Sequence, residues 1–350
     1  MPNRVKPAKK NGQAICPLAR LAPMPRVIKP MLATLVDEPF SDPDWIFETK
    51  WDGFRSICFL RNGKAHFVSR NQLDMTPQYP ELAKIGAQVK AEQAILDGEI
   101  VALDEHGRPR FQLLQPRHGR KNVGEIARLA KHSRIVYYVF DLLYYNGHDL
   151  MSCALVDRKA VLKKIIRPGK IVNYSFHVVG DGKAFFREIE KFRLEGMMAK
   201  RAASAYVQKR SRDWLKVKTI QRSEVVIGGY TKPRRSREYF GALVVGLYRN
   251  GELHYVGHSG GGFDRKSLKQ IYDLLQPLKT SVCPFVVKPQ TNEPVQWVKP
   301  RLVAEVKFSE WTADHRMRHP IFVGLREDKR PEDCTFEPEL DTDKVVKKAK

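Results

Sequence analysis

The sequence predicts an α+β protein of two domains, and its pattern changes character between them. Up to about residue 222, short apolar and β-branched runs alternate with helical stretches, which indicates antiparallel sheets with helices. After Ser223, short strands follow one another closely around a single helix, which is typical of a small β-barrel of the OB-fold type. Asn62-Gly63 and Asn250-Gly251 each join two strands and tolerate the positive φ angles of a tight hairpin. The expected domains are therefore 29–222 and 223–330.

In the first domain, strands are expected from runs of apolar residues and helices from apolar residues at helical spacing. The expected strands span 45–49, 55–60, 65–69, 95–103 and 135–140. One helix is expected at 154–166, ending at Pro168-Gly169, and another at 183–194. Phe185, Ile189 and Phe192 recur at helical spacing in the second helix, so we expect them in the core.

In the second domain, one helix is expected among five short strands. The strands span 225–230, 241–248, 252–258, 302–308 and 321–325. Leu268, Ile271 and Leu275 share a helical face, and Asp264 is placed to cap the start of that helix.

Both ends of the chain are expected to lack a packed core. Residues 1–28 are rich in proline and basic residues, which predicts a flexible basic arm, and 331–350 reads as a disordered polar and basic tail. No run of 18 apolar residues and no apolar signal-peptide core is found, so we expect a cytoplasmic, nucleoid-associated protein with no membrane partner. The five cysteines are scattered without a C-x-x-C pair, which argues against a disulfide framework and a zinc site.

The net charge indicates a polyanionic partner. Among 350 residues, Lys and Arg number 62 against 39 Asp and Glu, a formal net charge of +23. Such a surplus favours nucleic acid. An anionic membrane fits less well, because no long amphipathic basic helix stands out.

The most informative stretch runs from Lys50 to Arg55 and has the form K-x-D-G-x-R between two expected strands. A lysine can act as a nitrogen nucleophile once burial, neighbouring cations or a metal make it lose its proton. Arg55 can hold an anion in a fixed geometry, and Gly53 lets a backbone or ligand approach closely. The motif predicts a lysine that attacks phosphorus and carries the product covalently.

Three further segments suit a site of this kind, and each has a plainer interpretation. Arg70, in Ser69-Arg70-Asn71, could reach a sugar or phosphate or lie in a surface turn. Glu99, in an Asp-Gly-Glu inside an apolar strand, would need a metal or a ribose hydroxyl if buried, and otherwise is an exposed acid. Phe140 could offer its face to a purine or belong to the core.

Two segments nearer the middle of the chain add charge. Glu195 before Gly196 could hold a metal, whereas the plainer interpretation is a helix that ends at Gly196. Lys216 and Lys218 share one face of a strand and would present paired positive charge to a phosphate or to solvent. No G-x-x-x-x-G-K-[ST] loop is present, so phosphates would be held by lysine, arginine and metal.

In this order, the motifs resemble those of the covalent nucleotidyltransferases, which are DNA ligases, RNA ligases and capping enzymes. The run 316–329, which ends in R-x-D-K, resembles the end of ATP-dependent DNA ligases, and 29–33 with 44–50 is similar to the ligase module of bacterial ligase D. The resemblance covers about 29–330. The sequence shows neither the polymerase and phosphoesterase modules that are often joined to ligase D nor the helical DNA-binding domain of larger ligases. The basic arm at 1–28 is therefore a candidate for binding DNA.

The resemblance implies a nucleotidyltransferase (adenylation) domain at 29–222, an OB-fold domain at 223–330, and a hinge at 221–224. Lys50 would attack the α-phosphate of ATP. By the same resemblance, Glu48 would contact the adenine amino group, Phe140 would stack on the ring, and Arg55, Arg70 and Glu99 would contact the sugar or the DNA end. Lys216 and Lys218 would neutralise the α-phosphate, and Glu99 and Glu195 would help to bind Mg²⁺ (or Mn²⁺). Arg326, Asp328 and Lys329 would move in with the second domain, where Lys329 or Arg326 would orient the pyrophosphate.

The function that the resemblance implies is an ATP-dependent DNA ligase. It would seal 5′-phosphate/3′-hydroxyl nicks through lysyl-AMP and DNA-adenylate, in DNA repair or end joining. A monomer acting on nicked or broken duplex DNA is expected, with a Ku-like end-binding protein as a candidate partner. The alternatives are an RNA ligase or capping enzyme, and a non-catalytic protein that binds DNA ends.

Overall fold

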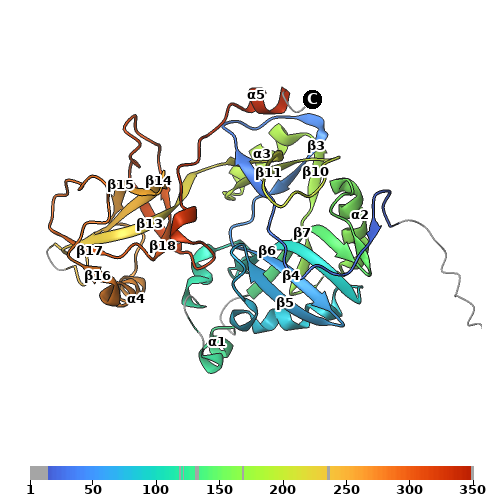
Figure 1. Cartoon of the computed structure of the whole chain (residues 1–350), viewed down its shortest axis with the longest axis horizontal. Coiled ribbons are helices and arrows are strands. Elements are labelled where there is room, and N and C mark those ends of the chain that lie inside the picture. The colour runs from blue at the N-terminus through green and yellow to red at the C-terminus, as the bar shows by residue number, and fades with distance from the viewer. Residues whose placement is uncertain are drawn as a thin grey trace, which may run out of the picture.

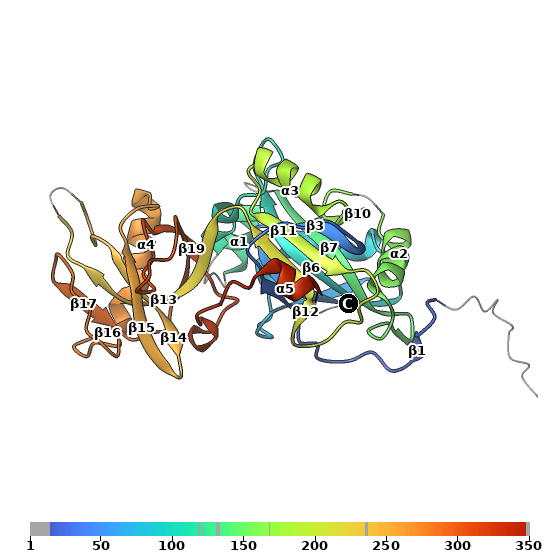
Figure 2. The ribbon, with the colours of Figure 1, turned by 90° about the horizontal axis from the view of Figure 1, so that it is seen from above.

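A computed structural model describes residues 15–117, 120, 122–130, 134–167, 169–234 and 237–347. Two domains lie next to each other along the long axis of the molecule (Figures 1 and 2). Among the described residues, the first domain holds two sheets and three helices. The second domain holds a single bent sheet and one helix (Figure 1). The α+β architecture with an OB-fold second domain is thereby confirmed.

The first domain is built on two mostly antiparallel sheets. The larger sheet has the order β1-β8-β7-β6-β4-β5, with β9 beside β7: β1 Arg20–Leu21, β8 His148–Asp149, β7 Arg134–Tyr145, β6 Gln93–Leu103, β4 Phe54–Arg61, β5 Lys64–Ser69 and β9 Val172–Tyr174. The smaller sheet has the order β10-β3-β11-β12-β2: β10 His177–Gly180, β3 Asp42–Thr49, β11 Gly196–Arg201, β12 Arg210–Lys218 and β2 Leu32–Leu35. The two sheets are linked through the turn between β3 and β4, which carries the K-x-D-G-x-R motif.

Helices and short 3₁₀ turns cover these sheets. They are α1 Val123–Ala130, α2 Leu155–Ile165, α3 Gly182–Lys191, and the 3₁₀ turns η1 Thr76–Gln78, η2 Pro80–Ala87, η3 Phe111–Leu113 and η4 Gln115–Arg117. In α3, Ile189 is buried as expected, but Phe192 is 64% exposed. The helix has already ended at Lys191, so Phe192 leaves the apolar face and Phe186 is buried in its place.

The second domain folds around one apolar core. Its strands are β13 Gln221–Thr231, β14 Leu243–Arg249, β15 Glu252–Ser259, β16 Lys279–Thr280, β17 Val295–Val298, β18 Val303–Phe308 and β19 Ile321–Leu325. Helix α4, Arg265–Leu275, begins with a capping box in which the Asp264 side chain accepts from the Ser267 backbone, as expected for its N-cap. It is followed by the turn η5 Gln276–Leu278. Asn62 and Asn250 adopt the positive φ angles predicted for the two hairpins.

The N-terminal segment is more ordered than the sequence suggests. Arg20 and Leu21 pair with β8, and Ile28 is buried in the core. Cys16 and Cys153 form a disulfide, so the expectation of no disulfide is wrong for this pair. The predicted flexible arm is therefore wrong for residues 15–28, while residues 1–14 lie outside the described part of the chain.

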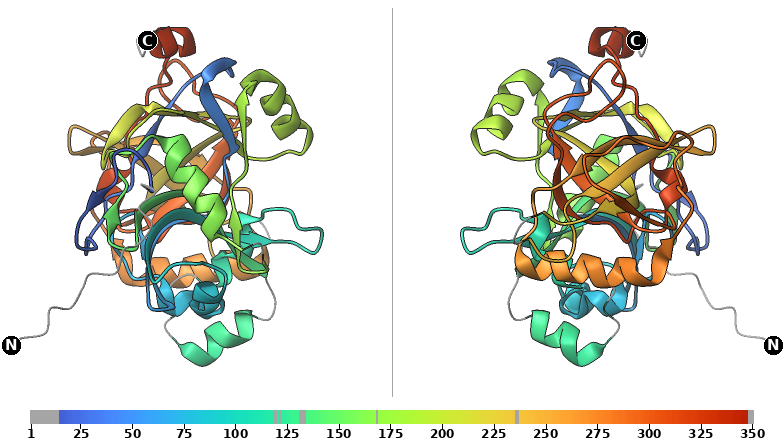
Figure 3. Two further views of the ribbon diagram at one scale, coloured as in Figure 1. Left: turned by 90° about the vertical axis from the view of Figure 1, so that its right-hand side faces the viewer. Right: turned by 90° about the vertical axis from the view of Figure 1, so that its left-hand side faces the viewer.

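The C-terminal segment is also ordered. After the turn η6, Pro331–Asp333, the chain crosses back to the first domain, where Leu340 bridges to Val36 and Thr342 hydrogen-bonds to Asp37. Helix α5, Thr342–Lys347, is the last helix before the C-terminus (Figure 3). Its Val345 is buried in a core of the first domain. The predicted disorder is wrong for 331–347, because a few apolar and capping side chains anchor an otherwise polar segment; 348–350 lie outside the described residues.

Within the described residues, each helix is too short or too polar to cross a membrane.

Candidate active site at the domain junction

A cavity of about 180 Å³ opens where the two domains meet. The first domain contributes the turn after β3, part of β6 and the end of β12, and the second contributes the start of β13, part of β18 and the residues after β19. Eight side chains predicted to be functional line it: Lys50, Arg70, Glu99, Glu195, Lys216, Lys218, Arg326 and Lys329. The tertiary structure therefore brings together motifs separated by up to 279 residues.

Lys50 stands just after β3, in contact with the strand that carries Gly196. Its backbone N–H donates to the carbonyl of Gly196 at 2.9 Å, and its Nζ forms an ion pair with the Glu195 carboxylate. Burial lowers the pKa of Lys50, but the opposite charge of Glu195 outweighs this and raises the pKa above its ordinary value. Glu195 thus favours the charged form of Lys50, whereas burial favours the neutral amine that a nucleophile needs.

The two glycines of these motifs allow close backbone approach. A Cβ on Gly53 would overlap the carbonyl of Ile100, and one on Gly196 would overlap that of Val217. Gly196 is the first residue of β11, so the interpretation as a helix end is wrong. In both places a larger residue would push Lys50 or Glu195 away from the cavity.

The carboxylates around Lys50 are crowded and mostly buried. Burial raises the pKa of Glu99 to about 8, against the opposing charge of Arg326. Burial together with the negative charges of Glu195 and Glu305 raises the pKa of Asp52 to about 6. A cation at this point would relieve both effects.

These oxygen ligands fit a magnesium ion that is held partly by substrate. No cluster of three or more metal-ligating side chains occurs among the described residues. Mg²⁺ is commonly bound by one or two carboxylates, several waters and substrate phosphates rather than by an all-protein cage. Glu99 and Glu195 both line the cavity, and their predicted contact with a metal ion stays a prediction.

Lys216 and Lys218 place positive charge on β12, the strand beside β11, where Gly196 pairs with Lys218. Lys216 Nζ lies 2.7 Å from Glu337 Oε2, and burial lowers the pKa of Lys216 to about 8 despite that carboxylate. Lys218 Nζ donates to the Arg222 carbonyl at 2.6 Å, and burial and Lys50 lower its pKa. The two lysines thus face the cavity, and the interpretation as a solvated strand edge is wrong.

The R-x-D-K motif reaches the same cavity from the second domain. Arg326 makes a two-point ion pair with Asp328 at 2.8 Å and also contacts Glu305 at 2.9 Å. Lys329 Nζ lies 3.1 Å from Glu224 Oε2. The Asn71 side chain, next to Arg70, donates to the Asp328 carbonyl at 2.9 Å.

Glu48 is placed in a packed cluster beside the cavity rather than on its wall. Its carboxylate lies 2.7 Å from Lys159 Nζ and 2.9 Å from Lys200 Nζ. Burial alone would raise the pKa of Glu48, but the two lysines outweigh it and lower the pKa. Both oxygens are thus engaged, and this placement gives no support to the predicted contact between the Glu48 side chain and adenine.

Phe140 and Arg55 belong to the same packed region. Lys200 Nζ lies 4.2 Å from the centre of the Phe140 ring, and the Arg55 guanidinium lies 5.2 Å from it. Arg55 makes a two-point ion pair with Asp97, at 3.0 and 2.6 Å. Neither side chain lines the cavity in this structure, so the predicted contacts with base and sugar stay predictions.

Several residues of the site were missed from the sequence. Arg222 contacts Asp52 at 3.0 Å and Glu305 at 3.2 Å, and it lies in the segment predicted only as a hinge. Glu337 contacts both Lys216 and Arg210, and Lys159 supports Glu48. Arg222 could have been suspected from its neighbours in the hinge, whereas no local pattern marks Glu337 or Lys159.

The class of protein is a covalent nucleotidyltransferase. It is defined by an adenylation-type domain of antiparallel sheets, an OB-fold domain, and a lysine in the cavity that charged side chains of both domains line. Comparison with known families agrees with this class. The family described as "ATP dependent DNA ligase domain" matches residues 30–218, and "ATP dependent DNA ligase C terminal region" matches residues 236–329. The chain belongs to the ATP-dependent DNA ligase family.

Similar proteins include ligase D proteins. The chain is 38% identical to the "Multifunctional non-homologous end joining protein LigD" of Pseudomonas aeruginosa, over 94% of this chain and 40% of that protein. It is 35% identical to the protein of the same name from Mycolicibacterium smegmatis, over 89% of this chain and 40% of that protein. The chain thus spans less than half of these relatives.

A DNA ligase and a solved structure are also similar. The DNA ligase of Pyrobaculum calidifontis is 33% identical, over 84% of this chain and 56% of that protein. The structure described as "mycobacterial DNA ligase D complexed with ATP and MES" is 32% identical, with a TM-score of 0.65, and the match covers 89% of this chain and 98% of that one.

Proposed function

We propose that this chain is an ATP-dependent DNA ligase that seals nicks through a lysyl-AMP intermediate. The observation that carries the proposal is Lys50, which is ion-paired to Glu195 in a cavity with Lys216 and Lys218 on one wall and Lys329 on another. This arrangement supports a nucleophile facing a triphosphate whose charge is balanced from both domains.

In the first step, Lys50 Nζ attacks the α-phosphorus of ATP. Glu195 accepts a hydrogen bond from Lys50 Nζ and so orients it, and Lys50 passes its proton to water before it attacks. The N–P bond forms as the bond from the α-phosphorus to the bridging oxygen breaks, and pyrophosphate leaves toward Arg326 and Lys329. A divalent cation bound at Glu99 and Glu195 would supply charge that offsets the transferring phosphate.

In the later steps, the covalent AMP passes to DNA. The 5′-phosphate at a nick attacks the phosphorus of lysyl-AMP and frees Lys50, and the 3′-hydroxyl then displaces AMP to form the phosphodiester. Splitting the reaction this way stores the ATP energy in a phosphoramidate until DNA arrives.

Labelled ATP tests the proposal directly. With Mg²⁺ and ATP labelled on the α-phosphate, the wild-type chain is expected to form a covalent adduct that survives denaturation, and Lys50→Ala is expected to abolish it. Lys209→Ala, at an exposed lysine, is the matched control and keeps the adduct. An adduct on Lys50→Ala would identify a different nucleophile.

Nick sealing then separates the classes of acceptor. Nicked duplex DNA is expected to be sealed in preference to nicked RNA, because the matching families are those of DNA ligases. Preference for RNA, or transfer of GMP from GTP, would favour an RNA ligase or capping enzyme, and absence of any adduct would favour a non-catalytic binder of DNA ends.

The proposed setting is the joining of broken duplex ends by a monomer in the nucleoid. The printed names of the Pseudomonas and Mycolicibacterium relatives, which refer to non-homologous end joining, support it. Joining of linear duplexes should rise when a Ku-like end-binding protein is added, while sealing of a single nick should not. An equal response of both substrates would argue against such a partnership.

A further inference from the structure

The two domains are joined beside the cavity by a side-chain amide that takes the place of a strand. Within the described residues, β18 is the only named strand that pairs with β19; on the other edge of β19, Gly261 bridges Ile321 and accepts from the Phe322 N–H at 3.0 Å. At the end of that edge, Gln115 Oε1 accepts from the Leu325 N–H at 2.7 Å, and Gln115 Nε2 donates to the Leu325 carbonyl at 3.0 Å. One carboxamide therefore satisfies both backbone groups, as a neighbouring strand would.

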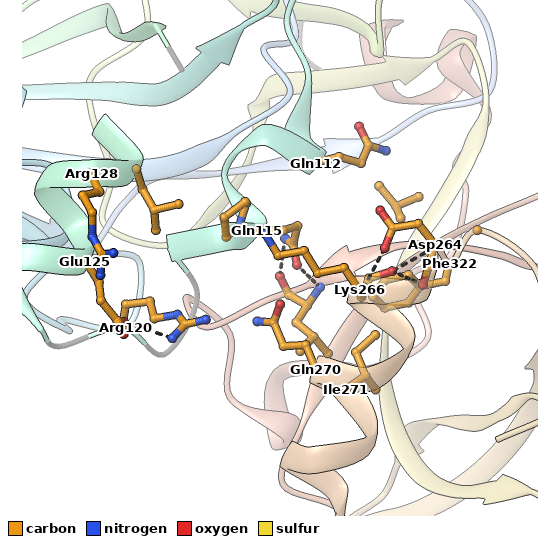
Figure 4. A pocket seen from close by; sticks show the side chains of 16 residues that line it. Gln112, Gln115, Arg120, Glu125, Arg128, Asp264, Lys266, Gln270, Ile271 and Phe322 are labelled. Atoms are coloured by element: carbon orange, nitrogen blue, oxygen red, sulfur yellow. Dashed lines mark hydrogen bonds and ion pairs between the residues drawn. The ribbon is translucent and has the colours of Figure 1, made fainter. Parts of the chain in front are cut away.

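Further contacts between β19 and the first domain surround this amide. Gln115 lies at the start of η4 in the first domain and lines a cleft of about 530 Å³, whose opposite wall is α4 of the second (Figure 4). Val323 of β19 is buried in the main hydrophobic core of the first domain, together with Phe111. A Cβ on Gly324 would overlap both Phe111 and Gln115, so only glycine lets the strand approach this closely.

The contact lies immediately before the R-x-D-K motif. The Arg326 guanidinium lies 5.0 Å from the centre of the Phe111 ring and 5.1 Å from that of Phe54. The next residue, Glu327, accepts from Gln78 Nε2 at 2.9 Å. Gln115 thus holds the end of the strand from which Arg326 and Lys329 project into the cavity.

This closed arrangement leaves no room at Lys50 for a duplex. The cavity of about 180 Å³ is walled by both domains, and a nick in double-stranded DNA is far larger. The second domain must therefore move away from Lys50 before the 5′-phosphate can reach the lysyl-AMP, and the contact between Gln115 and Leu325 breaks when it does.

We propose that Gln115 is a positioning residue for the adenylation of Lys50, because it holds Arg326 and Lys329 over the cavity in that step alone. The inference rests on the proposed function. The proposed role predicts different effects on two half-reactions. Gln115 contributes to the attack of Lys50 on ATP, and it does not contribute to sealing DNA that already carries AMP.

The test compares Gln115→Leu with the wild-type full chain in those two half-reactions. We expect single-turnover formation of labelled lysyl-AMP to slow about 10-fold, because two hydrogen bonds are lost and two backbone groups are left unpaired. Sealing of a chemically pre-adenylated nick without ATP is expected to stay within about twofold of wild type, since it bypasses the closed state. Gln112→Leu, in the same cleft but outside this contact, is the control and should leave both rates unchanged.

A second variant approaches the contact from the other domain. Gly324→Ala should reproduce the selective loss, because the added methyl group displaces Gln115. Equal loss of both half-reactions in Gln115→Leu, or no loss in either, would overturn the positioning role. A wild-type chain that seals pre-adenylated nicks but forms no lysyl-AMP would instead overturn the proposed function.

Discussion

The ion pair between Lys50 and Glu195 explains how a nucleophilic lysine is held at rest. Glu195 keeps the proton on Lys50 by outweighing the effect of burial on its pKa. The same carboxylate fits a divalent cation, and its charge would then be shared. A cation bound to the Glu195 carboxylate would therefore lower the pKa of Lys50, and a neutral amine is the form that attacks phosphorus.

At the residue scale, the pKa of Lys216 leads to a prediction of how ATP affinity depends on pH. Burial lowers the pKa of Lys216 to about 8, so above that pH the free lysine is mostly neutral. Bound phosphates favour the charged form, so binding must then take up a proton and weakens as the pH rises. We expect the KM for ATP in lysyl-AMP formation to rise above about pH 8, by up to about 10-fold per pH unit.

Lys216→Arg provides the comparison for this prediction. A guanidinium stays charged throughout the range, so its KM for ATP should be nearly flat above pH 8 even if its absolute value is higher. The same rise of KM in wild type and variant would show that another group titrates.

At the element scale, the segment after the second domain is the main surprise. Residues 331–347 cross to the first domain and place Glu337 on Lys216 and Arg210, at 2.7 and 2.8 Å. A triphosphate bound at Lys216 must displace this carboxylate. The segment thus competes with the nucleotide for the same cation.

Glu337→Gln should reveal that competition. We expect the KM for ATP to fall about fivefold well below pH 8, where Lys216 stays charged even though the loss of Glu337 lowers its pKa further, because more of the protein then has Lys216 free to bind phosphate. The measurement is the ATP dependence of lysyl-AMP formation. Glu339→Gln, at an exposed acid of the same segment, should change nothing, and a rise of KM in Glu337→Gln would mean that Glu337 supports binding instead.

At the scale of the whole molecule, the formal charge of +23 predicts that phosphate contacts dominate DNA binding. We expect the affinity of the Lys50→Ala variant for a nicked duplex to fall about 10³-fold between about 50 and 200 mM salt, through release of counterions. Fluorescence anisotropy across a salt series measures this. A nearly flat salt dependence would contradict a binding mode based on phosphates.

The strands and helices with strong local periodicity were predictable, whereas α1, β2, β10 and β11 were not expected. The hairpins at Asn62 and Asn250 and the capped start of α4 each depend on a few neighbouring residues, and all three are confirmed. The end of α3 was misplaced by three residues, so Phe192 was wrongly assigned to the core. Helix ends depend on small local energies that a periodic pattern does not contain.

The candidate site was predictable where a motif carries its own chemistry. Lys50, Glu195 and Lys216 line one cavity as their motifs suggested. Glu48 and Phe140 carry equally recognisable motifs, yet they lie in a packed cluster beside the cavity. Whether a side chain faces ligand or protein depends on its partners, and those of Glu48, Lys159 and Lys200, lie 111 and 152 residues away in the chain.

The sequence by itself determined the family and the two-domain architecture, and it predicted Lys50 as the nucleophile, because these features depend on short motifs and local periodicity. Only the tertiary structure decided the state of Lys50, the closing contact of Gln115 with Leu325, and the return of Glu337 to the first domain. These features depend on charges and hydrogen-bonding groups that lie 121 to 210 residues apart in the chain. Their pairing depends on how the two domains pack, and local sequence patterns do not predict that packing.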